Sequence, residues 1–496
     1  MTGNVTTLSL LLTQGGSWEF FVPIYQRDYV WDTAQFDVFI ESLTSNTPKY
    51  FNNIIVYDHN PGSSNYSYEI IDGQQRLTSI YLFLFALYNH SSKNTFNLTS
   101  ALLQNILFTQ QNNGHLRLQG NNNITNLINN LTSGCYLDNY NRAINWMTNN
   151  VKNDQSGMNF VQTTLANKFI GIVHVQNSDS IANNEIFEEI NSNGVELLNY
   201  ELILSHILNG ITPQQQQAFY NNTWTQIRNQ KNQFNIDDEN FENIFFYFTV
   251  YHVKHSIVKK NFFRVFKQLW IDNGLDLSWF AQNFSAFFEF YLNIAKTGMG
   301  NEYTLFRILK NYTSMPLLYA FSVNNPVTFM QNFHQINSLL LRRRLTHAGS
   351  SGLATPIYDA VKSMTIPSRL MIDTHSVLIQ NITYTEDEVK IIIGVLNGTY
   401  DFPDGATLEH IYPQTPNLVN WPNPINQALI SDLGNMTILT HAQNAQAGNS
   451  DFITKRDIYI KSRFIINNYF ATVNQWNTDK IYTRKQDLLK GILQIY

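Results

Sequence analysis

The sequence predicts an α/β plus α fold, and three observations along its 496 residues support this prediction. Short apolar runs alternate with helical patterns in residues 1–210, which is typical of an α/β domain. Apolar residues recur at helical spacing in residues 211–395, and this predicts a helical linker bundle. Two strand patterns followed by helices occur in residues 396–496, so we expect three domains.

The first domain is predicted to contain three strands, with a turn and a helix after the third strand. Three apolar runs bounded by polar or turn residues predict strands at Phe20–Ile24, Ile54–Tyr57 and Tyr68–Ile71. An Asp-Gly turn follows the third strand, and a helical pattern then extends from Gln74 to about Leu87. The N-terminus of such a helix presents free N–H groups, which suit a phosphate.

The middle domain is expected to be helical throughout. The segments Glu242–Trp270 and Trp279–Ala295 carry apolar residues at helical spacing, and their aromatic residues are expected in the core. The stretch Asn397–Asp404 is rich in Gly, Pro and Asp, which predicts a boundary before the last domain.

Composition excludes several classes of protein. Hydrophobic residues make up 43% of the chain, enough for a globular protein. No run approaches the roughly 18 apolar residues of a membrane span, and no basic signal peptide opens the sequence. We therefore expect a cytoplasmic protein without a membrane partner. The single cysteine, Cys135, excludes an internal disulfide and a cysteine-based zinc site.

Global charge gives no indication of nucleic-acid binding, because the formal net charge is −5 and only 14% of residues are charged. Three stretches are nevertheless basic. From Phe452 to Tyr496, eight basic residues stand against three acidic ones. The runs Arg342–Arg344 and Lys254–Lys267 contain no acid. Each stretch either faces phosphates or is only a solvated helix face.

The clearest chemical motif lies in the last domain. The run Leu408–Gln414 places Glu409 beside His410 at the end of a predicted strand, where the pair offers an oxygen ligand and a neutral base. The run Leu433–Leu439 predicts a second strand after a Gly-Asn turn. Asn444 is expected on the following helix, directed back at the first strand.

These motifs resemble the DUF1524 domain, which has the HNH, or ββα-metal, nuclease fold. The resemblance implies that His410 is the general base and that Glu409 and Asn444 hold one Mg²⁺ or Mn²⁺ ion. It implies a catalytic set of His410, Asn435 and Asn444, in which Asn435 holds the loop and orients His410. His441 stays open as an alternative to Asn444, because many HNH enzymes use a histidine as this metal ligand.

A second set of motifs lies in the first domain. Arg27 belongs to a Tyr-Gln-Arg run rich in hydrogen-bond donors, and Arg76 lies in the first turn of the helix predicted after the Asp-Gly turn. A cation in that turn opposes the helix dipole, so an anionic partner explains Arg76 better than helix stability does. Asp72 either serves the same ligand, through Mg²⁺ or as a proton acceptor, or forms a structural ion pair with Arg76. A later Phe-x-x-x-Asn run starts at Phe187.

Together these motifs resemble the DUF262 family, whose fold is like that of ParB and sulfiredoxin. Proteins that join this domain to a DUF1524 domain are similar to the GmrSD type IV restriction enzymes and to phosphorothioate-sensing defence nucleases. The resemblance implies that the first domain binds or hydrolyses a nucleoside triphosphate, and no Gly-Lys-Ser/Thr run suggests a P-loop. The residues implied in nucleotide binding are Tyr25, Gln26, Arg27, Asp72, Gly73, Gln74, Gln75, Arg76, Phe187 and Asn191.

The resemblance thus implies a nucleotide-regulated, metal-dependent endonuclease that cuts foreign, modified DNA in antiphage defence. Two alternatives stay open. One is a nucleotide- or DNA-sensing binding module with a non-catalytic HNH scaffold, and the other is an RNA nuclease. The sequence specifies neither the DNA modification nor the nucleotide, and it leaves nicking, double-strand cleavage and a homo-oligomer open.

Overall fold

The chain forms two compact units, Met1–Gln226 and Ile227–Tyr496. Among the described residues, none of the helices combines the length and the apolar character needed to cross a lipid bilayer. The structure is a computed structural model, and it describes residues 2–13, 18–23, 29–58, 66–109, 116–120, 134–175, 198–208, 211, 213–295, 300–349, 351–379, 382–400, 402 and 405–496.

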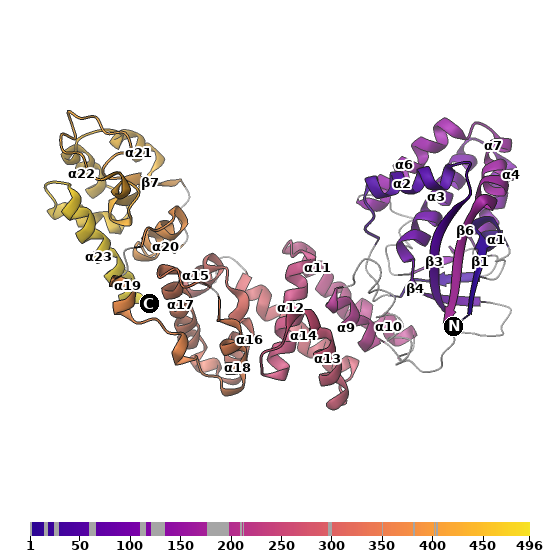
Figure 1. The fold of residues 1–496 in the computed structure, drawn as a ribbon, viewed down its shortest axis with the longest axis horizontal. Helices are drawn as coiled ribbons and strands as arrows, with labels where there is room; N and C mark the ends of the chain where they lie inside the picture. The colour runs from indigo at the N-terminus through magenta and orange to yellow at the C-terminus, as the bar shows by residue number, and fades with distance from the viewer. Residues whose placement is uncertain are drawn as a thin grey trace. The chain divides into compact units, whose positions relative to one another are not determined.

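Within the described residues, six strands of the first unit form one mixed sheet (Figure 1). The strands are β1 Thr2–Thr7, β2 Trp18–Phe21, β3 Lys49–Asp58, β4 Tyr66–Asp72, β5 Leu118–Gln119 and β6 Lys168–Val175. Their order in the sheet is β1-β6-β3-β4-β2-β5. β6 is antiparallel to β1 and parallel to β3, whereas β4 is antiparallel to β3 and parallel to β2.

Helices of the first unit build a core with this sheet. The helices are α1 Leu8–Thr13, α2 Thr33–Thr44, α3 Gln74–Lys93, α4 Asn97–Leu107, α6 Cys135–Asn150, α7 Asp154–Asn159, α9 Asn199–Leu208 and α10 Pro213–Phe219. Helix α3 is the most deeply placed, since every residue from Leu77 to Leu87 is buried. Its apolar side chains share one core with Ile54, Val56 and Ile70 of the sheet.

The structure confirms the predicted strands and helix of this unit, with different ends. The strand predicted at Phe20–Ile24 is β2, which begins and ends earlier, and Ile24 itself lies outside the described residues. The other two strands are longer than predicted, and α3 continues to Lys93. Its last turn carries Lys93, whose positive charge suits a helix C-terminus.

The second unit begins with helices. They are α11 Thr225–Gln233, α12 Asp238–Val253, α13 Phe262–Asp272, α14 Leu277–Ala295, α15 Asn301–Leu309, α16 Met315–Asn324, α17 Phe329–Leu345, α18 Ala354–Ser363, α19 Thr374–Ile379 and α20 Glu386–Leu396. The segment predicted as helical over Glu242–Trp270 is divided, because Lys254 adopts a left-handed conformation and ends α12. The aromatic residues lie in the core as predicted, and the rings of Phe245 and Phe284 are 4.2 Å apart.

A strand hairpin and three helices complete the second unit. They are β7 Ala406–His410, β8 Met436–Thr440, α21 His441–Ala447, α22 Phe452–Ile460 and α23 Thr478–Ile495. The order of strand, strand and helix predicted from the motifs is present. A separate apolar core containing Ile411, Leu439, Tyr459 and Phe470 holds the hairpin against α22 and the chain that follows it. The α/β plus α fold class is therefore confirmed.

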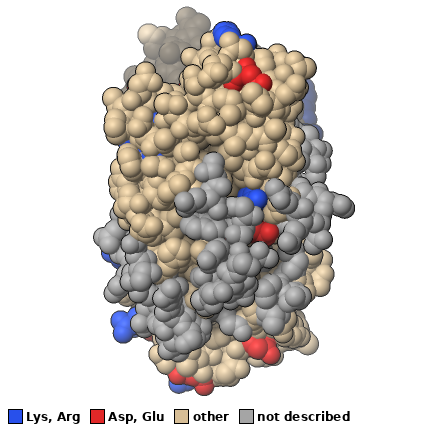
Figure 2. Space-filling model, turned by 90° about the vertical axis from the view of Figure 1, so that its right-hand side faces the viewer, with Lys and Arg blue, Asp and Glu red and all other residues tan. Residues whose placement is uncertain are grey.

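Few charged groups lie on the face of the molecule that Figure 2 draws. On the face drawn in Figure 2, Lys, Arg, Asp and Glu side chains are sparse and scattered among other residues. This agrees with a charged content of only 14%.

Candidate functional site

His410 is the last residue of the first strand in the C-terminal hairpin. β7 pairs antiparallel with β8, so that His410 lies opposite Met436 and Glu409 lies opposite Thr437. Successive side chains of a strand point to opposite faces, so His410 and Glu409 are directed to different sides of the hairpin. The hairpin therefore separates Glu409, the predicted metal ligand, from His410, the predicted base.

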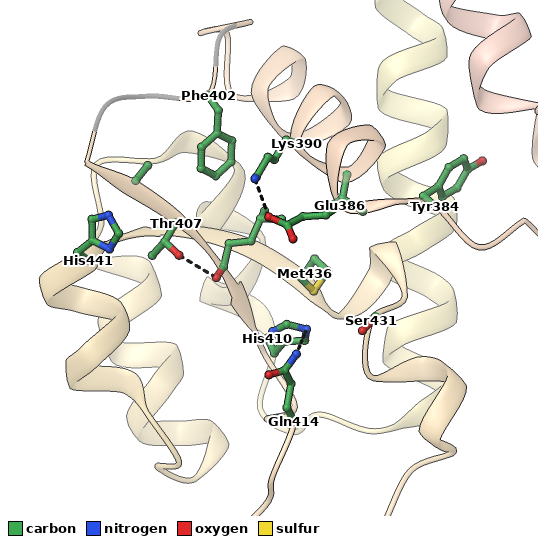
Figure 3. A pocket seen from close by; sticks show the side chains of 13 residues that line it. Tyr384, Glu386, Lys390, Phe402, Thr407, His410, Gln414, Ser431, Met436 and His441 are labelled. Atoms are coloured by element: carbon green, nitrogen blue, oxygen red, sulfur yellow. Dashed lines mark hydrogen bonds and ion pairs between the residues drawn. The ribbon is translucent and has the colours of Figure 1, made fainter.

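The His410 side of the hairpin opens into a cavity of about 350 Å³ (Figure 3). The His410 ring lies beside Gln414, and their Nε2 atoms are 3.3 Å apart. Helix α20 contributes Glu386 and Lys390, which form an ion pair at 2.6 Å. The cavity thus combines a base, a carboxylate and an ammonium group. Sequence reasoning missed the two residues from α20, which it assigned to the middle domain.

The surroundings of His410 keep its ring neutral. Burial lowers the pKa of His410 below the usual 6.5, and the nearby Lys455 ammonium lowers it further. The Glu386 carboxylate acts in the opposite direction but does not cancel these effects. At pH 7 the imidazole is therefore neutral and able to accept a proton.

Glu409 lies on the buried side of the hairpin, in an ion pair. Lys455 Nζ is 2.6 Å from Glu409 Oε1, and the two side chains are only 1% and 7% exposed. Tyr459 donates its hydroxyl to the same carboxylate oxygen at 3.2 Å. Lys455 also donates to the backbone carbonyl oxygen of His410 at 2.9 Å. The ion pair therefore holds the backbone that carries the base, and sequence reasoning did not assign Lys455 this position.

Asn435 is fully buried between the two strands. Its side-chain oxygen accepts hydrogen bonds from the backbone N–H of Tyr412 at 2.8 Å and from Trp476 Nε1 at 2.9 Å. Its amide nitrogen donates to the carbonyl oxygens of Tyr412 and Ile430. These bonds tie the chain just after His410 to the start of β8. Asn435 is placed to hold this loop, and its buried side chain does not line the cavity.

Asn444 and His441 lie on the helix that follows the second strand. Asn444 Nδ2 donates to the carbonyl oxygen of Leu408 at 3.3 Å and to Thr407 Oγ1 at 3.4 Å, so its side chain is directed back at β7 as expected. His441 is exposed and lines the cavity, near Thr407 in Figure 3. The choice between Asn444 and His441 as a metal ligand stays open on this geometry.

The predicted pair of metal ligands does not fit a shared metal site. Glu409 is buried in its ion pair with Lys455, on the face away from His410 and its cavity. Within the described part of the chain, no three His, Cys, Asp or Glu side chains converge as a metal-binding group. Mg²⁺ often uses only one or two carboxylates and keeps several waters. The carboxylate that lines the cavity is that of Glu386.

Several basic side chains of the run Arg342–Arg344 and of the stretch from Phe452 to Tyr496 contact other groups of the protein. Arg342 donates to the carbonyl oxygens of Tyr496 and Ile372, and Arg343 donates to that of Gly349. Three cations of the C-terminal stretch are buried and bind protein groups, so they do not face phosphates. These three are Lys455, Arg484 and Lys485.

In the first unit, the predicted turn between strand and helix is present at Gly73. This residue precedes α3 with a φ of 92°. A Cβ atom there would lie 3.2 Å from both Asn53 O and Ile54 Cα. Conformation and space therefore both favour glycine. Asp72 ends β4 and Gln74 begins α3, so the predicted motif lies at the end of a strand and the start of a helix.

Arg76 and Gln75 both make contacts with the protein in this structure. Arg76 Nη1 donates to the carbonyl oxygen of Asn53 at 2.7 Å, and Gln75 Oε1 accepts from the backbone N–H of Val30 at 2.9 Å. Burial lowers the pKa of Arg76, and the charge of Asp72 opposes this effect. The other predicted nucleotide-binding residues lie outside the described residues. They are Tyr25, Gln26, Arg27, Phe187 and Asn191.

Two protein-family models match the chain. Residues 8–208 match the N-terminal domain of the GmrSD restriction endonuclease. Residues 371–491 match the C-terminal domain of the GmrSD restriction endonucleases. Together the two models span more than half of the chain, and the second contains His410 and the helix α20 that borders its cavity. A search of curated proteins found no match.

Proposed function

Since the chain belongs to the GmrSD restriction endonucleases, and is thus a GmrSD-like type IV restriction enzyme, we propose that it cuts DNA in the His410 cavity. The observation that carries this proposal is the place of the His410 ring at the wall of a cavity of about 350 Å³, where burial lowers its pKa. A nuclease base must be both neutral and accessible, and this histidine meets both conditions.

In the proposed reaction, the His410 ring takes a proton from a water molecule. The water oxygen forms a bond to the phosphorus atom, and the bond from phosphorus to one nucleoside oxygen breaks. The leaving oxygen acquires a proton from solvent. The ion pair of Lys455 and Glu409 holds the backbone carbonyl of His410, and Asn435 holds the loop after it. The HNH type of this site is part of the proposal, supported by the strand, strand and helix order.

A divalent cation is a second part of the proposal. We expect Mg²⁺ or Mn²⁺, because the cavity offers oxygen and nitrogen donors rather than thiolates. Glu386 and His441, which line the cavity, would hold the ion; Asn444, which does not line it, stays the alternative to His441, and Glu409 would not hold the ion. When bound, the ion would neutralise charge that develops on the phosphate.

A nucleoside triphosphate at the first unit is a third part. The turn at Gly73 leads into a helix of 20 residues, and helix N-termini favour phosphate groups. Arg76 lies in the first turn of that helix, where a cation does not stabilise the helix itself. Hydrolysis of the nucleotide and recognition of modified DNA belong to the same proposal, with a ParB- and sulfiredoxin-like fold for this unit.

One experiment distinguishes the proposed DNA nuclease from its two alternatives, a sensing module with a non-catalytic scaffold and an RNA nuclease. The purified chain is mixed with unmodified, glucosylated, methylated and phosphorothioated DNA, and with an RNA, with and without each nucleoside triphosphate and Mg²⁺. The proposal expects cutting of at least one DNA, with a response to a nucleotide. Binding without cutting would favour the sensing module with a non-catalytic scaffold, and cutting of RNA alone would favour an RNA nuclease.

A further inference from the structure

One basic surface of the second unit has no role in the site described above. It consists of Lys254, Lys259, Lys260 and Arg264, here called the basic segment. Lys254 ends α12, and the others lie in the short turn before α13 and in the first turn of that helix. All four side chains are exposed.

Negative charge is missing along this part of the chain. No Asp or Glu occurs between Lys254 and Ile271. Within the described residues, none of the four basic side chains forms an ion pair. The carboxylate of Asp359 approaches the turn, but it accepts a hydrogen bond from the backbone N–H of Ser256 at 3.0 Å. The segment therefore carries four exposed positive charges without an ion pair, and Asp359 is a carboxylate near its turn.

This arrangement is unfavourable for the isolated protein. Arg264 lies in the first turn of α13, and Lys259 and Lys260 lie in the turn just before that helix. Cations near a helix N-terminus oppose the helix dipole. No contact within the described residues offsets this effect for Lys259, Lys260 and Arg264, so an anionic partner explains their placement, whereas Lys254 at the end of α12 suits the dipole of that helix.

The contrast with the other basic stretches strengthens this argument. Arg342 and Arg343 bind backbone carbonyl groups, and three of the eight cations of the C-terminal stretch are buried, while Lys461, Arg463 and Lys490 of that stretch are exposed. The basic segment keeps its charges in solvent. Val258 is the exposed large apolar side chain in this segment, at 68% exposure, so the segment lacks the broad apolar face with which helices bind membranes.

We propose that the basic segment binds the sugar-phosphate backbone of duplex DNA without regard to its sequence, outside the His410 cavity. This inference rests on the proposed nuclease function. Phosphate contacts of this kind supply affinity and position a duplex, whereas they carry no sequence information. Contacts by Lys and Arg side chains release condensed counterions, so their loss is measurable as a change in salt dependence.

The test compares the full chain with the variant Lys259→Gln/Lys260→Gln/Arg264→Gln. Binding of an unmodified duplex of about 30 base pairs is measured without divalent metal, between about 50 and about 200 mM salt. The slope of log affinity against log salt concentration should be smaller in magnitude for the variant by about 2 to 3. The parent should therefore lose about 15- to 60-fold more affinity than the variant over this range. The matched control Lys49→Gln/Lys93→Gln/Lys362→Gln makes the same change in net charge at exposed lysines elsewhere.

The proposal predicts that this control keeps the slope of the parent. The proposal would be overturned if the parent and the basic-segment variant had equal salt slopes. It would also be overturned if the basic-segment variant and the control variant lost salt slope equally. A variant that loses slope on duplex RNA but not on DNA would overturn the choice of DNA. If the parent cuts DNA but the slopes agree, only the inference fails, whereas a parent that neither binds nor cuts DNA also contradicts the proposed function. Circular dichroism checks that both variants are folded.

Discussion

Trp476 Nε1 donates a hydrogen bond to Asn435 Oδ1 at 2.9 Å, in the interior of the C-terminal hairpin region. The same oxygen accepts from the backbone N–H of Tyr412, two residues after His410. One buried amide therefore connects the start of β8, the loop after β7 and the chain that leads to α23.

Replacing Asn435 should destabilise the fold. In Asn435→Ala, the buried N–H groups of Trp476 and Tyr412 lose their acceptor, so the free energy of unfolding should fall by about 3–5 kcal/mol. Chemical denaturation measures this loss. The control Asn468→Ala changes an exposed residue nearby and should shift stability by less than about 0.5 kcal/mol. Unchanged stability in Asn435→Ala would contradict a role in holding the loop.

The ion pair of Glu409 and Lys455 makes a second prediction. Glu409→Gln leaves a buried ammonium without its counter-charge, so the free energy of unfolding should fall by about 3–5 kcal/mol. The double variant Glu409→Gln/Lys455→Met removes both charges and should recover most of this loss. Mn²⁺ affinity of the folded protein should stay the same in both variants. A variant that keeps its stability but loses Mn²⁺ binding would instead make Glu409 a metal ligand.

The pH dependence of cutting follows from the pKa of His410. The base works in its neutral form, so the rate should rise with pH through the pKa of His410 and level off above it. Burial and Lys455 lower this pKa from 6.5, so the acidic limb should lie below pH 6.5. Single-turnover rates across a pH series, at saturating Mg²⁺, measure the limb. A limb centred above pH 6.5 would disagree with the environment described for this ring.

Arg76 makes a prediction for the first unit. If Arg76 contacts a triphosphate, then Arg76→Ala removes a charge-assisted contact of about 1.5–3 kcal/mol, and nucleotide affinity should fall about ten- to hundredfold. Binding of each nucleoside triphosphate is measured by calorimetry, with a melting curve to detect loss of the hydrogen bond to Asn53. Equal nucleotide affinity with reduced stability would make Arg76 a structural partner of Asp72 and Asn53.

The sequence predicted those parts of the fold that depend on local pattern. The strands around Ile55 and Ile70, and the helix after Gly73, follow from apolar runs and an Asp-Gly turn. The hairpin and the helix bearing Asn444 follow from motifs in order along the chain. Such features need no knowledge of distant contacts.

The arrangement of the candidate site was less predictable. Strand alternation alone indicates that His410 and Glu409 point to opposite faces, and the motif comparison overlooked this. The partner of Glu409 is Lys455, 46 residues along the chain, and only tertiary packing joins them. Glu386 likewise enters the cavity from a helix that its sequence pattern assigns to the middle domain. Long-range packing of this kind leaves little trace in local sequence.

The most direct test of the account is the rate of DNA cutting by His410→Ala. Removal of a general base should slow single-turnover cleavage by about 10²- to 10⁴-fold. His410 is partly exposed at the cavity wall, so the melting temperature should stay close to that of the parent. His375→Ala, which changes an exposed histidine outside the cavity, should cut at the parent's rate. If His410→Ala cuts as fast as the parent, the His410 cavity is not the nuclease site.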